Sequence, residues 1–132
     1  MKSWRGVILT CGGLLFAVMG AIGAEAPEGS KGGKITTITG EIVDTRCYIG
    51  DDQDQKGPKH QACAVKCAKG GATLAILQDK TNNLYLIMPK EDGENPNTPF
   101  MEMVAERVMV NGKVFEVGGM RAIIPQVVKK AK

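Results

Sequence analysis

The chain has 132 residues, with 17 lysines and arginines against 14 aspartates and glutamates, which gives a formal net charge of +3. This length suits one domain, since single cores usually run to about 100–200 residues, and it excludes a second domain. The charge excess is too small to mark a surface for a polyanion, and only 5% of the residues are aromatic. We therefore expect no nucleic-acid partner.

The N-terminus has the plan of a secretory signal peptide. Lys2 and Arg5 precede an uncharged stretch, Gly6 to Ala24, that ends in small residues. We predict that residues 1–24 are a signal peptide, cleaved near 23 or 24, and that Cys11 leaves with it. The protein is then periplasmic or extracellular. An uncleaved membrane anchor is the alternative, because the apolar run approaches the about 20 residues that span a bilayer.

The segment that follows, residues 25–34 (EAPEGSKGGK), is rich in Gly and charge and holds Pro and Ser as well. Such a composition cannot bury an apolar core, so we interpret it as a flexible tether. Residues 35–132 are predicted to form a single domain.

Strand patterns dominate the first half of this domain. Ile35 to Tyr48 is rich in β-branched residues and predicts a strand with a bulge or sharp bend at Gly40. Leu74 to Gln78 and Leu84 to Met88 are short apolar runs separated by DKTNN, which predicts a hairpin.

The second half continues the pattern after a polar loop. Phe100 to Ala105 indicates a short helix. Arg107 to Val117 is strand-like on both sides of Asn111-Gly112, which fits either a tight hairpin or one long strand with a bulge at Gly112. Ala122 to Val128 forms the last strand, and Pro125 places it at an edge or a bulge.

These elements predict a mainly β fold. Five strands and one inserted helix in about 100 residues favour a small barrel of the oligonucleotide/oligosaccharide-binding (OB) type. A small α+β sandwich is the alternative.

The inserted helix is predicted over Pro58 to Lys69, with proline in its first turn and Gly70-Gly71 as its stop. At about 100° per residue, His60, Cys63 and Cys67 fall within a sector of about 60°. We place Cys47 at the end of the preceding strand, where the helix can fold back over it.

Four ligands of soft or borderline character then converge: Cys47, His60, Cys63 and Cys67. A Cys3His set is used for zinc, and three thiolates also suit Cu(I). Metal binding explains how free thiols persist in an oxidising compartment. An odd number of cysteines also permits a disulfide from Cys47 to Cys63 or Cys67 with one spare thiol, or a working redox thiol.

The chain resembles a group of small exported bacterial proteins of unsettled function. The resemblance is carried by GEIVDTRCY at Gly40 to Tyr48, HQACAVKCAKGG at His60 to Gly71, the following hairpin and the Val108 to Gly112 strand. It implies an OB-like barrel and a shared site at Cys47, His60, Cys63 and Cys67, but no substrate or reaction.

The sequence therefore predicts an exported, non-enzymatic metal-binding domain that holds zinc or copper in a structural or metal-handling role. With one histidine in the chain, a Ser/His/Asp set is not available beside the metal ligands. A membrane or periplasmic redox protein is the partner we expect. The alternatives are a thiol-disulfide redox protein and a disulfide-stapled interaction module without metal.

Overall fold

In a computed structural model of the chain, residues 33–51 and 54–132 are described. The predicted signal peptide and all but the end of the predicted tether lie outside these residues. Among the described residues, no helix is long and apolar enough to cross a membrane.

Five strands close into a barrel in the order β1-β2-β3-β5-β4, which confirms the predicted fold class. All neighbouring pairs are antiparallel except β3 and β5, which are parallel. The strands are β1 (Lys34–Asp44), β2 (Leu74–Gln78), β3 (Leu84–Ile87), β4 (Arg107–Val117) and β5 (Met120–Lys130). The predicted hairpin is the β2–β3 pair.

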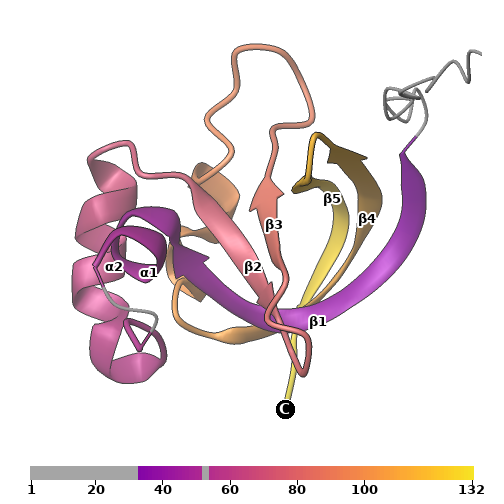
Figure 1. The fold of residues 1–132 in the computed structure, drawn as a ribbon. Helices are drawn as coiled ribbons and strands as arrows, with labels where there is room; N and C mark the ends of the chain where they lie inside the picture. The colour runs from indigo at the N-terminus through magenta and orange to yellow at the C-terminus, as the bar shows by residue number, and fades with distance from the viewer. Residues whose placement is uncertain (1–32, 52–53) are drawn as a thin grey trace, which may run out of the picture.

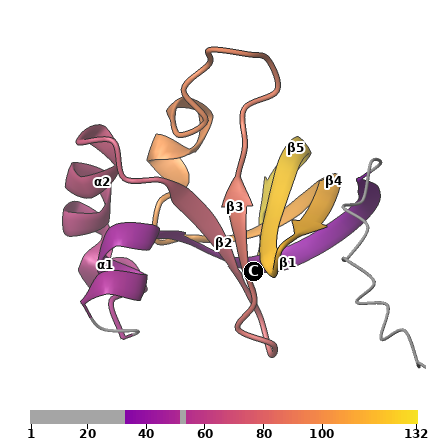
Figure 2. The same ribbon diagram turned by 45° about the horizontal axis from the view of Figure 1, so that its top comes forward.

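Within residues 33–51 and 54–132, four helical segments interrupt the strands. They are α1 (Thr45–Gly50), the 3-10 helix η1 (Pro58–His60), α2 (Gln61–Lys69) and the 3-10 helix η2 (Thr98–Met103). The predicted 58–69 helix is thus a 3-10 turn that continues into an α-helix, and the short helix expected from Phe100 begins two residues earlier as a 3-10 helix. Helices α1 and α2 lie side by side beyond the end of β1, as both views show (Figures 1 and 2).

The prediction that one strand runs from Ile35 to Tyr48 is wrong at its C-terminal end. β1 stops at Asp44, and Thr45–Gly50 forms α1. The Asp44 side chain accepts a hydrogen bond from the Cys47 N–H and so caps the new helix. This local bond outweighs the strand preference of the sequence, and it places Cys47 in a helix rather than at a strand end.

Asn111-Gly112 does not form a hairpin turn. β4 runs unbroken from Arg107 to Val117, with an irregular register at this dipeptide, so the long bulged strand is the alternative that the structure confirms. Pro125 pairs with Gly112 next to this irregularity, which agrees with the prediction that the proline lies at an edge or a bulge. The turn lies instead at Gly118 and Gly119, which both have positive φ.

A continuous core fills the barrel and extends under the helices. Its centre is formed by inward-facing residues that are at most 2% exposed: Ile38, Ile42, Leu74, Ile76, Ile87, Val108, Val110 and Ile123. Ala64 and Ala68 of α2 belong to the same cluster. Because alanine is small, the helix can pack close to the strands and present its neighbouring face to α1.

Gly40 lies where β1 pairs with both of its neighbours at once, and its own partners are Gln78 of β2 and Val108 of β4. A Cβ atom placed there would lie 2.1 Å from the carbonyl oxygen of Leu77, which is backbone and cannot rotate away. Glycine therefore permits the close approach of β1 and β2 at this position.

We predict that Gly40→Ala lowers the free energy of unfolding by about 1–3 kcal/mol, because the methyl group overpacks this contact. The matched control is Gly50→Ala, where the nearest atom belongs to the exposed and flexible Arg46 side chain. Urea unfolding of both variants measures the difference. Equal stability of the two variants would contradict the close-packing argument.

Candidate metal centre

The centre is built where β1 ends and α1 begins. Asp44 is fully buried, and its Oδ1 accepts the Cys47 N–H at 2.9 Å. This bond turns the chain into α1 and fixes Cys47, which is 5% exposed, with its sulfur toward α2. The buried position of Cys47 is therefore set by a helix cap.

Helix α2 supplies the other donors. Cys63 is exposed and Cys67 is half-buried, and both thiols approach Cys47: the Sγ–Sγ distances from Cys47 are 3.9 Å to Cys63 and 3.6 Å to Cys67. His60, in the 3-10 turn before α2, has a side chain that is only 10% exposed. The predicted one-faced arrangement of these three residues does bring them to Cys47.

Both ends of α2 are held by the segment between β3 and β4. Buried Asn97 donates to the carbonyls of Ala68 and Ala72 at 3.2 and 2.8 Å, and its Oδ1 accepts the Leu74 N–H at 3.2 Å. Gln61, at the start of α2, donates to the Val104 carbonyl at 3.0 Å. These bonds fix the helix against the barrel, so its cysteines have a defined position relative to Cys47.

The donor atoms form two overlapping groups, each with all members within 4.8 Å of one another. One group is Cys47, His60 and Cys63, and the other is Asp44, Cys47 and Cys67. Cys47 is common to both, and in the described residues neither group contains both Cys63 and Cys67. Cys47 is thus shared by two sets of three donors, one completed by His60 and Cys63 and the other by Asp44 and Cys67, and either set could hold a metal ion.

The thiol separations match those of a metal site better than those of a disulfide. Two sulfurs bound to one tetrahedral zinc at about 2.3 Å each lie about 3.8 Å apart, close to the 3.6 and 3.9 Å found here. A disulfide bond is only about 2.05 Å long. The three described cysteines are free thiols.

Sequence reasoning missed Asp44. Besides capping α1, its Oδ2 lies 3.2 Å from His60 Nε2, so one buried carboxylate contacts two of the predicted ligand residues. The sequence does hold one indication of its role: Asp is a preferred N-cap residue, and Asp44 stands three residues before Cys47. Its burial and its contact with His60 depend on tertiary packing.

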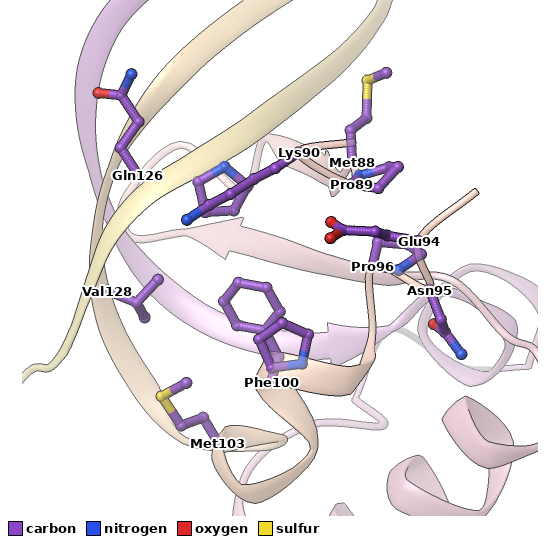
Figure 3. Close-up of a pocket in the computed structure, with 12 residues that line it drawn as sticks. Met88, Pro89, Lys90, Glu94, Asn95, Pro96, Phe100, Met103, Gln126 and Val128 are labelled. Atoms are coloured by element: carbon purple, nitrogen blue, oxygen red, sulfur yellow. The ribbon is translucent and has the colours of Figure 1, made fainter. Parts of the chain in front are cut away.

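A separate cavity of about 320 Å³ lies between β5 and the segment that follows β3 (Figure 3). It is lined by Met88, Pro89, Lys90, Glu94, Asn95, Pro96, Pro99, Phe100, Met103, Pro125, Gln126 and Val128. Its volume is within the range of small-ligand sites. None of these residues belongs to the cysteine cluster, so the two features are distinct.

Comparison with protein-family models, with curated proteins and with solved structures finds no match to this chain.

The protonation of Cys47 predicts a pH dependence. Burial raises the pKa of the Cys47 thiol, and hydrogen bonding with Cys67 and the carboxylate of Asp44 add to the effect. In the unfolded chain a cysteine has a pKa of about 8.5. The folded, metal-free protein thus holds this proton to a higher pH than the unfolded chain does, and its stability must fall as the pH rises above about 8.5.

Chemical unfolding of the reduced, metal-free protein between about pH 7.5 and 10 measures this dependence. We expect the fall to be smaller in Cys47→Ala, which lacks the buried thiol, than in the wild type. Cys63→Ala, which removes an exposed thiol, is the matched control and should keep most of the fall. Identical pH profiles for all three proteins would contradict the assignment to Cys47.

Proposed function

We propose that this protein is an exported, non-enzymatic metal-binding domain in which Cys47, His60, Cys63 and Cys67 hold a zinc or copper ion. The observation that carries the proposal is the pair of Sγ–Sγ distances, 3.6 and 3.9 Å, from Cys47 to thiols of a second helix. The predicted N-terminal signal peptide and the resemblance to small exported bacterial proteins support the export of the chain and a shared site.

Binding by all four residues requires one local movement. Two sulfurs on one zinc can be no farther apart than about 4.6 Å, twice the Zn–S bond length, so Cys63 and Cys67 must move closer together. Cys63 is exposed, so its side chain can rotate without displacing core atoms, whereas Cys47 is buried and fixed. On binding, the thiols release their protons to solvent, and the metal replaces the proton that the buried Cys47 thiol otherwise holds.

The ion would serve structure or metal handling beside a membrane or a periplasmic redox protein. Helices α1 and α2 have six and nine residues, lengths at which isolated helices are unstable in water. An ion bound by Cys47 of α1 and Cys63 and Cys67 of α2 ties the two helices together. Zinc and copper both accept these ligands, and metal supply selects between them.

The exported protein, purified without added metal, tests the proposal by mass spectrometry. We expect the native mass to exceed the denatured mass by one metal ion, and we expect Cys47, Cys63 and Cys67 all to react with a thiol reagent after denaturation. Absence of metal together with two unreactive cysteines would contradict the proposal and support a disulfide-stapled interaction module instead.

Removal of the ion should also destabilise the fold. At a free metal concentration about 100 times the dissociation constant, binding adds about 2.7 kcal/mol to the free energy of unfolding. We therefore expect a strong chelator to lower the Tm measured by circular dichroism, and added zinc or copper to restore it. A Tm that the chelator leaves unchanged would contradict a structural role for the ion.

A thiol-disulfide redox protein is the second candidate, favoured by the exposed Cys63 thiol 3.9 Å from the buried Cys47 thiol. In this reaction, the Cys63 thiolate attacks a disulfide of a partner protein and releases one partner thiolate. Cys47 then displaces the second partner sulfur, which leaves a Cys47–Cys63 disulfide and a reduced partner. The raised pKa of Cys47 slows the second step, because the thiolate is the attacking species. We therefore rank metal binding first.

A further inference from the structure

Asp44 is the buried carboxylate of the cluster. Asp44 is the last residue of β1 and is 0% exposed. One of its carboxylate oxygens lies within 4.8 Å of the sulfurs of both Cys47 and Cys67. A buried charge is expensive unless it is hydrogen-bonded. Here both oxygens have a partner, the Cys47 N–H for Oδ1 and His60 Nε2 for Oδ2. The carboxylate is thus held in one place beside the thiols.

The contact with Asp44 determines which nitrogen of His60 is free. An ionised carboxylate only accepts hydrogen bonds, so beside ionised Asp44 the Nε2 atom carries the proton that it donates to Oδ2. In the neutral imidazole, Nδ1 then has the lone pair. Carboxylates that bind the second nitrogen of a metal-ligating histidine fix its tautomer and its orientation in this way.

We propose that Asp44 is the positioning residue of this centre: it presents His60 to the ion through Nδ1, and its charge makes the centre favour a divalent ion over a monovalent one. The inference rests on the proposed metal-binding function and deepens it by specifying the class of ion. Zn²⁺ is the divalent representative and Cu⁺ the monovalent one.

The preference follows from Coulomb's law and from the ligand set. The attraction between a fixed carboxylate and an ion is proportional to the charge of the ion, so Asp44 stabilises a divalent ion twice as strongly as a monovalent ion at the same position. Zn²⁺ also takes four ligands and so uses the imidazole. Cu⁺ is well served by soft thiolates alone. For both reasons, the ion charge and the ligand set, loss of Asp44 should lower the affinity for Zn²⁺ more than the affinity for Cu⁺.

Asp44→Asn is the variant that tests this role. Asparagine is as good an N-cap as aspartate, so it can keep the bond to the Cys47 N–H while it removes the charge. Asp51→Asn is the matched control, because it also removes a carboxylate near α1. The Asp51 side chain is 51% exposed and forms an ion pair with Arg46. Circular dichroism establishes that each variant is folded.

Competition with chelators in oxygen-free buffer gives the Zn²⁺ and Cu⁺ dissociation constants. For Asp44→Asn we expect a loss of about 10- to 100-fold in Zn²⁺ affinity. The loss in Cu⁺ affinity should be at most about half as large on a logarithmic scale. Asp51→Asn should change neither affinity appreciably. Equal losses for both ions, or no loss in Asp44→Asn, would overturn the proposal.

Nitrogen NMR of His60 in the metal-free wild-type protein tests the orientation without any metal. We expect the proton on Nε2 and an unprotonated Nδ1, and a shift of this tautomer in Asp44→Asn. A wild-type proton on Nδ1 would overturn the positioning role, even if the variant failed to fold. A wild-type protein that shows the Nε2–H tautomer but binds neither ion would refute the proposed function and the ion preference. The contact between Asp44 and His60 would still be supported in that case.

Discussion

The hydrogen bond from the Cys47 N–H to the Asp44 carboxylate is the interaction on which the centre depends. It ends β1, starts α1, and buries a thiol at the end of the barrel that α2 covers. Because Asp44 also pairs with Leu74 of β2 and contacts His60, the same residue joins the sheet, the cap and the cluster.

The second constraint is the close packing of α2. Ala64 and Ala68 lie in the barrel core, and Asn97 binds the carbonyls at the C-terminal end of the helix. The face next to this alanine stripe carries Cys63 and Cys67. A small-residue stripe thus sets the distance between the helix and the barrel, and the distance in turn brings the cysteines within 4 Å of Cys47. The core residues and the cysteines of the candidate metal centre thus lie on adjacent faces of one short helix.

Much of this arrangement could be predicted from the sequence, because it depends on local periodicity. The strand pattern predicts the barrel, and helical phasing places His60, Cys63 and Cys67 on one face. The sequence could not decide between a hairpin and a bulge at Asn111-Gly112, since that depends on pairing with β5. It misplaced Cys47 at a strand end, because the cap at Asp44 outweighs a β-branched run. It missed Asp44 as part of the site, because burial and the contact with His60 are tertiary properties.

X-ray absorption at the metal edge of the protein isolated from its native compartment can establish whether the three thiols bind one ion. We expect an inner shell of sulfur at about 2.3 Å with one nitrogen at about 2.0–2.1 Å if the ion is zinc, or a sulfur-dominated shell if it is copper. A shell of oxygen and nitrogen only, or a protein without stoichiometric metal, would contradict the claim that Cys47, Cys63 and Cys67 form one centre.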